Sequence, residues 1–238
     1  QLSVNLNRLF DSNQNLLESL KQVTTNIAHD LRTPLARLRQ GLEAARAGRA
    51  DARRYGEAID SAIVDSDELL TTLAALLRIA QIESGSRRSG FREIDISAIV
   101  GRLVAAYAPV AEDQGKTFNA HVESGLLLQG DGELLLQAGA NLVENALKHT
   151  QADARIDVTL ERSDSGIVLT VADTGPGIPA AMRSKVLERF FRLERSRTTP
   201  GSGLGLALVA AVADLHAIDL SLEDNNPGLL VRLRFPAA

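Results

Sequence analysis

The stretch Asn141-Leu142-Val143-Glu144-Asn145-Ala146-Leu147-Lys148-His149 combines a helical apolar pattern with a row of polar side chains. Four polar residues recur at steps of three and four, the spacing of one helix face: Asn141, Glu144, Asn145 and Lys148. The pattern from Asp131 to Thr150 therefore predicts a helix that buries one side and presents polar groups on another. Oxygen ligands suit Mg²⁺, and a lysine ammonium pairs with phosphate oxygens. A solvated helix face explains this segment alone equally well.

A glycine-containing loop, Asp173-Thr174-Gly175-Pro176-Gly177-Ile178-Pro179, follows an alternating strand pattern at 167–171. Its two glycines let the backbone approach a flat ligand closely. The carboxylate of Asp173, at the end of the strand, suits the exocyclic amine of adenine. The competing interpretation is a tight turn, because Gly and Pro are turn residues in any case.

A second glycine-rich loop, Gly201-Ser202-Gly203-Leu204-Gly205-Leu206, opens a predicted helix at about 203–216. Glycine N–H groups beside a helix N-terminus favour phosphate. Rossmann spacing and the Gly-Lys-Ser/Thr of a P-loop are both missing, which disfavours those two sites. The basic stretch 190–200 between the loops suits a lid in which Arg192 reaches phosphate, or a plain exposed loop.

The first third of the chain predicts two long helices joined near 46–52. Apolar residues recur at steps of three or four from Leu6 to Leu42 and again from Tyr55 to Ala80. A lone helical hairpin leaves one apolar stripe uncovered. We therefore expect two copies to pair in a four-helix bundle, as a homodimer.

His29 lies off this stripe, because Ile27 and Leu31 on either side belong to it. A neutral imidazole is a good nucleophile for phosphorus. Asp30 can accept or orient its proton, and Thr33, one turn along the same face, can position a water. Taken alone, such a residue is more often an exposed helical histidine without a chemical role.

The composition excludes several kinds of site. The chain has 238 residues, a formal net charge of −4 and no cysteine, so disulfides and thiolate metal sites are ruled out. No basic run suggests a nucleic-acid surface. No apolar run approaches the ~20 residues that span a bilayer. Since the chain begins at Gln1, we expect a fragment whose membrane contact, if any, lies upstream.

Helix and strand patterns alternate from residue 91 onward. Strands are predicted at 91–96, 116–122, 156–160, 167–171, 218–223 and 229–235, and helices at 97–114, 131–150 and 203–216. Residues 162–166 predict a hairpin turn. This order indicates an α+β fold in layers.

The segments around His29, Asn145, Asp173 and Gly203 resemble, in order, the H, N, G1 and G2 boxes of bacterial sensor histidine kinases. Phe190-Phe191-Arg192 resembles the F box of the same family. Five boxes in this order are far more specific than any one of them. The resemblance covers about residues 18–236.

The resemblance implies three parts. Residues 1–17 would end a HAMP-like signalling linker, and residues 18–86 would be an all-α helical hairpin that forms a dimeric four-helix bundle for dimerisation and histidine phosphotransfer. Residues 90–238 would be a catalytic α+β two-layer sandwich that binds ATP, of the type shared with Hsp90, type II topoisomerases and MutL. The linker near 84–90 would act as a hinge.

The same resemblance implies the chemistry at the helical hairpin. His29 would be the phosphoacceptor and Asp30 its general base. Thr33 would serve dephosphorylation of a partner response regulator.

It also implies how Mg²⁺ and ATP would be held. Asn145 would be the metal ligand, supported by Asn141, with Lys148 on the phosphates and Arg192 on the γ-phosphate. Asp173 would bind the adenine amine. Glycines would shape the pocket and border the lid: Gly175, Gly177, Gly201, Gly203 and Gly205.

A protein of this kind would phosphorylate its own His29 from Mg-ATP and donate the phosphoryl group to an aspartate of a response regulator. It would be the cytoplasmic part of an inner-membrane protein. Two alternatives stay open: an Hsp90- or MutL-type ATPase without phosphohistidine, and a catalytically silent dimeric scaffold. Two departures from the family pattern, Leu187 for phenylalanine and His149 for tyrosine, bear on how the lid packs.

Overall fold

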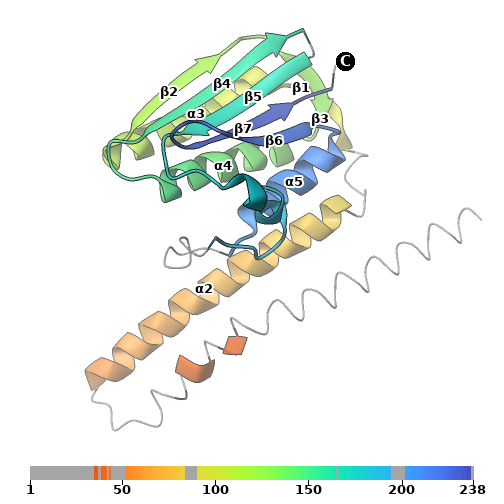
Figure 1. Ribbon diagram of the computed structural model, residues 1–238. Coiled ribbons are helices and arrows are strands. Elements are labelled where there is room, and N and C mark those ends of the chain that lie inside the picture. Colours follow the sequence, from red (N-terminus) through yellow and green to blue (C-terminus); the bar gives the residue numbers. More distant parts are fainter. Residues whose placement is uncertain are drawn as a thin grey trace, which may run out of the picture. The chain divides into compact units, whose positions relative to one another are not determined.

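The computed structural model describes residues 35–36, 39–41, 43, 52–83, 90–164, 166–193 and 202–236. The chain divides into two compact units, Gln1–Ser84 and Gly85–Ala238 (Figure 1). Every described residue of the first unit is helical, and its long helix is α2 (Ala52–Glu83). Among the described residues, no helix is long and apolar enough to cross a membrane.

Helix α2 carries an apolar stripe that is open to solvent in the single chain. Ile63, Leu70 and Leu77 follow one another at seven-residue intervals and are 55%, 65% and 47% exposed. Ile59, one turn before Ile63, is 55% exposed. A seven-residue apolar repeat is the pattern with which one helix packs along another.

The second unit is built on a five-stranded sheet of order β2-β4-β5-β7-β6. Its strands are β2 (Thr117–Val122), β4 (Arg155–Ser163), β5 (Gly166–Asp173), β6 (Asp219–Asp224) and β7 (Leu229–Arg234). Only β2 runs parallel to its neighbour, β4, and the other pairs are antiparallel. The register aligns buried side chains across four strands: Val158, Val171, Val231 and Leu222.

Three helices cover one face of this sheet (Figure 1): α3 (Ile96–Asp113), α4 (Gly132–His149) and α5 (Gly205–Leu215). Both α3 and α4 begin at an aspartate whose carboxylate accepts main-chain N–H groups of the first turn. Asp95 accepts from Ala98, and Asp131 accepts from Glu133 and Leu134. The core lies between helices and sheet, which confirms the predicted α+β two-layer architecture.

Shorter elements complete the unit. Strands β1 (Arg92–Asp95) and β3 (Leu127–Gly130) form a separate antiparallel pair. Two short 3₁₀ helices, η2 (Ala180–Met182) and η3 (Lys185–Leu187), follow β5. The sequence predicted β1 but neither β3 nor the 3₁₀ turns.

His216, just after α5, joins three parts of the second unit. Its Nδ1 lies 2.8 Å from the carbonyl oxygen of Val212, and its Nε2 accepts the N–H of Asp131 at 3.0 Å. The Phe91 ring stacks on it at a centroid distance of 4.5 Å. A neutral imidazole protonated on Nδ1 satisfies both hydrogen bonds. The side chain is 6% exposed, so this residue ties the end of α5 to the start of α4.

Candidate nucleotide site

Helix α4 presents Asn141, Asn145 and Lys148 beside its buried face. Asn141 and Asn145 are half-buried and Lys148 is exposed. The side-chain amide of Asn141 donates to the main-chain oxygen of Gln137 at 2.9 Å, one turn earlier. That bond fixes which way the amide points and leaves Asn141 Oδ1 for another neighbour.

Glu144, which the helical spacing grouped with this row, is engaged elsewhere. The hydroxyl of Tyr107 on α3 donates to Glu144 Oε1 at 2.5 Å. Burial, followed by this hydrogen bond and the charge of Glu144, raises the pKa of Tyr107. Glu144 therefore links α4 to α3, and the remaining polar row consists of two amides and one amine.

The start of α5 lies against that row. A Cβ atom at Gly205 would be 2.9 Å from Asn141 Oδ1 and 3.7 Å from Asn145 Nδ2. Only a residue without a side chain permits this approach. Gly205 follows Asn145 by 60 positions in the sequence. The second glycine-rich loop and the polar row of α4 thus belong to one site.

Gly203 joins the same loop to the Phe190–Arg192 segment. Its φ is +72°, and a Cβ there would be 2.9 Å from the main-chain carbon of Phe190 and 3.1 Å from Cγ of Arg192. The N–H of Phe190 donates to the carbonyl oxygen of Gly203 at 3.0 Å. Arg192 is therefore held next to the glycine-rich loop.

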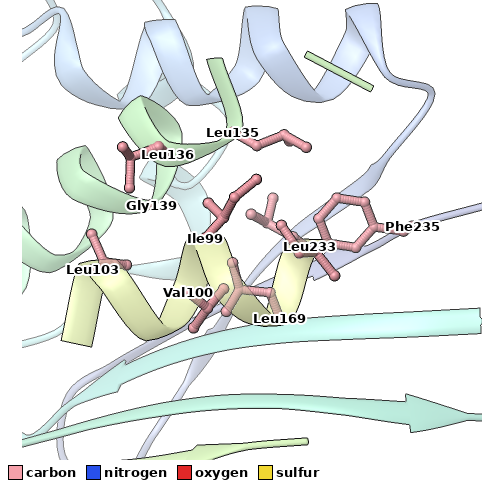
Figure 2. Close-up of a pocket in the computed structure, with 10 residues that line it drawn as sticks. Ile99, Val100, Leu103, Leu135, Leu136, Gly139, Leu169, Leu233 and Phe235 are labelled. Atoms are coloured by element: carbon pink, nitrogen blue, oxygen red, sulfur yellow. The ribbon is translucent and has the colours of Figure 1, made fainter. Parts of the chain in front are cut away.

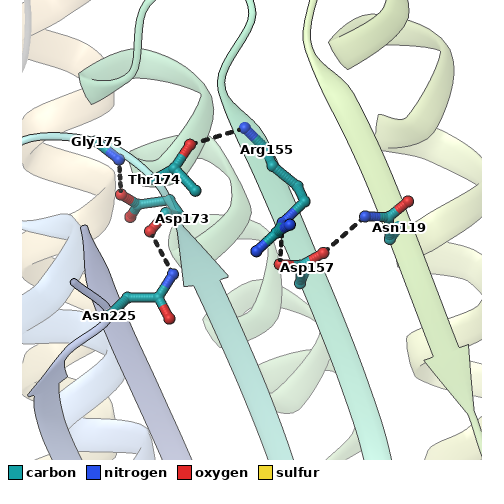
Figure 3. Close-up of polar contacts among 7 residues, drawn as sticks. All are labelled: Asn119, Arg155, Asp157, Asp173, Thr174, Gly175 and Asn225. Atoms are coloured by element: carbon teal, nitrogen blue, oxygen red, sulfur yellow. Dashed lines mark hydrogen bonds and ion pairs between the residues drawn. The ribbon is translucent and has the colours of Figure 1, made fainter. Parts of the chain in front are cut away.

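Asp173, at the end of β5, has its carboxylate held from one side (Figure 3). Its Oδ1 accepts the N–H of Gly175 at 2.7 Å and the N–H of Leu229 at 3.4 Å. Among the described residues, every hydrogen bond of this carboxylate reaches Oδ1. Oδ2 thus remains an acceptor for a ligand.

The Asp173 loop also contacts the end of α4. A Cβ at Gly175 would lie 2.8 Å from Asp173 Oδ1, 2.9 Å from Thr150 Cγ2 and 3.3 Å from the carbonyl oxygen of His149. Thr174 accepts the N–H of Arg155 through its hydroxyl at 2.9 Å (Figure 3). The contacts of Gly175 thus place the first glycine loop beside the end of α4.

Residues of the turn between β6 and β7 complete the surroundings of Asp173, and the sequence did not predict them. The amide of Asn225 donates to the main-chain oxygen of Asp173 at 2.8 Å (Figure 3). Gly177, with φ +65°, lies so close to Gly228 that a Cβ on it would be 2.7 Å from the Gly228 oxygen.

The site has an acidic side chain, Asp173, at one end and basic side chains at the other. Burial raises the pKa of Asp173, while the hydrogen bonds from Gly175 and Leu229 oppose that shift. Partial burial, then the positive charges of Lys148 and Arg192, lower the pKa of His149. One end thus offers a half-buried carboxyl acceptor and the other a group of basic side chains. An aminopurine and a chain of phosphates match these two ends.

An apolar pocket elsewhere in the second unit has a different character. Figure 2 shows it between α3, α4 and the sheet, with ten lining residues that are all apolar, among them Leu103, Leu135 and Leu233. A polyphosphate finds no partner there. Nor does the described part of the chain gather three or more His, Cys, Asp or Glu side chains around a metal position.

Four of the predicted site residues fall outside the described residues: His29, Asp30, Thr33 and Gly201. The others come together at one end of the helical layer, from the segments 141–150, 173–177, 190–192 and 203–205. Leu187 ends η3 and is half-buried beside the buried Val186.

Two protein-family models match the chain. Residues 19–85 match the His Kinase A (phospho-acceptor) domain, and residues 130–238 match the histidine kinase-, DNA gyrase B- and HSP90-like ATPase. The first match includes His29, and the second includes the whole nucleotide site described above.

Individual proteins agree with both matches. The probable sensor protein PcoS of Escherichia coli is 28% identical over 230 residues, which cover 96% of this chain and 49% of PcoS. A structure of the mycobacterial sensor histidine kinase MprB is 31% identical, with a TM-score of 0.54 over 61% of this chain and 96% of that one. The chain spans about half the length of the curated relatives it matches.

A third similarity extends over both units. The structure of histidine kinase ThkA in complex with response regulator protein TrrA gives a TM-score of 0.69 over 94% of this chain and 64% of that one. At 18% identity it shows a shared fold.

Proposed function

The chain belongs to the family of two-component sensor histidine kinases, and we propose that it transfers the γ-phosphoryl group of ATP to its own His29. The observation that carries this proposal is the approach of Gly205 to Asn141 and Asn145 beside the Asp173 loop. This contact joins the second glycine-rich loop to the polar row, and the contacts of Gly175 with Thr150 and His149 add the Asp173 loop, which supports one site for both base and phosphates.

ATP would lie with its base at Asp173 and its phosphates towards Lys148. Asp173 Oδ2 would accept a hydrogen bond from the exocyclic amine, while Gly175 and Gly177 leave room for the flat base. Lys148 and Arg192 would neutralise phosphate oxygens, with Gly203 and Gly205 lining the approach. Phosphoryl transfer depends mainly on such positioning and charge neutralisation.

The polar row fits Mg²⁺, which binds to few protein oxygens and keeps its waters and phosphate ligands. Asn145 would be the direct ligand and Asn141 its support. Bound there, the ion would shield charge on the transferred group. A side-chain amide and the absence of an acidic cluster among the described residues suit an ion held largely by the nucleotide.

The transfer would then occur in line. A bond would form between an imidazole nitrogen of His29 and the γ-phosphorus as the bond from that phosphorus to the bridging oxygen breaks. ADP would leave, and Asp30 would take the imidazole proton. The phosphoryl group would pass to an aspartate of a response regulator, and Thr33 would assist hydrolysis of that product.

We place this reaction in a homodimer. The exposed stripe of α2, formed by Ile59, Ile63, Leu70 and Leu77, supports pairing of two copies in a four-helix bundle. Residues 18–86 would form the bundle and residues 90–238 the ATP-binding domain, with residues 84–90 as hinge and 1–17 as the incoming signalling linker. The chain would be the cytoplasmic part of an inner-membrane sensor.

Labelling tests the proposal. The wild type and His29→Ala are incubated with γ-labelled ATP and Mg²⁺, and His121→Ala serves as control because His121 is exposed on β2, away from the site. Acid-labile, alkali-stable label in the wild type and control but not in His29→Ala is expected. A wild type that hydrolyses ATP without taking label would instead indicate an ATPase without phosphohistidine, and no binding of Mg-ATP would indicate a silent scaffold.

A further inference from the structure

The turn at 225–228 between β6 and β7 packs against Asp173. Three contacts connect them: the side chain of Asn225 and the N–H of Leu229 donate to Asp173, and the backbone of Gly228 passes against it. A Cβ on Gly228 would lie only 1.7 Å from the Asp173 oxygen. The turn therefore contacts both the main chain and the carboxylate of the residue proposed to bind adenine.

Asn225 donates a hydrogen bond to the Asp173 carbonyl, which strand pairing in the sheet leaves without a main-chain donor. Pairing between β5 and β7 ends at Ala172 and Leu230, one residue before Asp173. The next N–H, of Thr174, donates to Arg155 on the β4 side, so the Asp173 carbonyl points to the opposite, β7 side. There the amide of Asn225 donates to it at 2.8 Å, as a strand residue would.

The position of Asn225 is itself fixed. Its N–H donates to the carbonyl oxygen of Gly228 at 3.1 Å, which closes the turn on itself. The side chain thus reaches Asp173 from a short, internally bonded loop. A donor held in this way constrains the main chain at Asp173, from which the carboxylate side chain projects.

We propose that Asn225 is a positioning residue for base recognition, which holds the Asp173 carbonyl so that the free carboxylate oxygen faces the exocyclic amine of the nucleotide. This inference rests on the proposed role of Asp173. Because its amide bonds to the main chain of Asp173, Asn225 acts on selectivity through Asp173. A residue needed only for the turn would instead affect stability and the binding of all nucleotides alike.

The test compares two nucleotides in the full chain. ATP carries the amine, and purine riboside triphosphate lacks it. Dissociation constants with Mg²⁺ are measured by calorimetry for the wild type, Asn225→Asp and Asn225→Ala. The aspartate keeps the shape but cannot donate, and the alanine removes the group. Asn119→Ala is the matched control, because Asn119 donates to Asp157 at 2.8 Å on β2 and β4, away from Asp173 (Figure 3).

Both Asn225 variants are expected to lose about tenfold in the preference for ATP, the worth of one good hydrogen bond. Asn119→Ala is expected to keep the wild-type preference. An unchanged preference in either folded Asn225 variant, even with a lower melting temperature, would overturn the proposal while leaving Asp173 in its role. If Asp173→Asn also keeps the preference, the assignment of Asp173 fails and the inference with it.

Discussion

The two carboxylate oxygens of Asp173 have different surroundings. Oδ1 is held by the N–H groups of Gly175 and Leu229, so it orients the group. Oδ2 is the atom that we propose accepts a hydrogen bond from the adenine amine. Burial raises the pKa of this carboxyl, and the two N–H donors oppose the change and favour its charged form.

Asp173→Asn tests that division of work. Asparagine can still accept from Gly175 through its oxygen, but it turns an N–H₂ donor towards the adenine amine. We expect the dissociation constant for ATP to rise about 10- to 100-fold, since hydrogen bonds to charged groups contribute about 1.5–3 kcal/mol. Calorimetric titration measures this, and thermal melting confirms the fold. Unaltered ATP affinity would contradict the assignment.

A comparison of Gly228 with Gly125 distinguishes the effect of a steric clash from the effect of a positive φ angle. Both have a positive φ, +120° and +76°, but a Cβ at Gly228 would collide with Asp173 whereas nothing lies within 4 Å at Gly125. Gly125→Ala is expected to cost about 1–2 kcal/mol and to keep ATP binding. Gly228→Ala should cost more and abolish binding.

Denaturant unfolding and nucleotide titration of these two alanine variants provide the comparison. Equal losses of stability in both, with ATP binding retained, would mean that the contact between Gly228 and Asp173 is not needed.

The sequence grouped Asp173, Gly175 and Gly177 as candidate site residues because they stand together in one short motif. It missed Asn225, Gly228 and Leu229, which reach Asp173 across 52 or more positions. Their contact depends on β7 lying next to β5 in the sheet. The periodicity of a sequence predicts strands but does not predict their order in a sheet. Helical spacing likewise grouped Glu144 with the polar row, because it could not foresee Tyr107 on α3.

Helices α4 and α5 share an anchor in His216. Its Nδ1–H bonds to Val212 within α5, and its Nε2 accepts from Asp131 at the start of α4. Burial lowers the pKa of His216, while the Val212 carbonyl and the charge of Asp131 oppose that shift. The neutral ring is thus the form that fits both elements.

The anchor predicts a stability that depends on pH. In an unfolded chain histidine titrates near pH 6.5, and in the fold its pKa is lower. The stability from neutral His216 is therefore fully present above about pH 6.5 and is lost as the pH falls towards the folded pKa. We expect the melting temperature to fall more between pH 7.5 and pH 5 for the wild type than for His216→Gln.

Circular dichroism melts of both proteins provide this measurement. His149, whose pKa is also lowered, is common to both proteins, so their difference isolates His216. Parallel pH profiles would show that the ring is not the titrating anchor.

Elements with a long, regular pattern were predicted well. Helices α3, α4 and α5 and the β4–β5 hairpin lie within a few residues of their predicted bounds. Strand β3 was missed because its sequence, Leu127-Leu128-Gln129-Gly130, does not alternate between apolar and polar residues. The parallel pairing of β2 with β4 has no local signal either.

At the scale of the molecule, the open stripe on α2 predicts how copies associate. Burying one isoleucine contributes about 1.5–3 kcal/mol, and a charge at the same place costs more. Ile63→Glu is therefore expected to turn a dimer into a monomer at micromolar concentration, as measured by sedimentation velocity. Asp60→Ala, a change of an exposed residue on the same helix, should leave the dimer intact. A dimeric Ile63→Glu would exclude the stripe as the interface.

Strand β7 comes after β6 in the sequence yet lies between β5 and β6 in the sheet. Two of the donors to Asp173 lie in it or just before it: the N–H of Leu229 and the side-chain amide of Asn225. During synthesis on the ribosome, the proposed phosphate end of the site, on α4 and the start of α5, is complete before the proposed base end. The base end exists only after β7 has inserted between two strands already made. A chain cut short before residue 225 would lack both of these donors to Asp173 and also the strand, with its buried Val231 and Leu233, that joins β5 to β6.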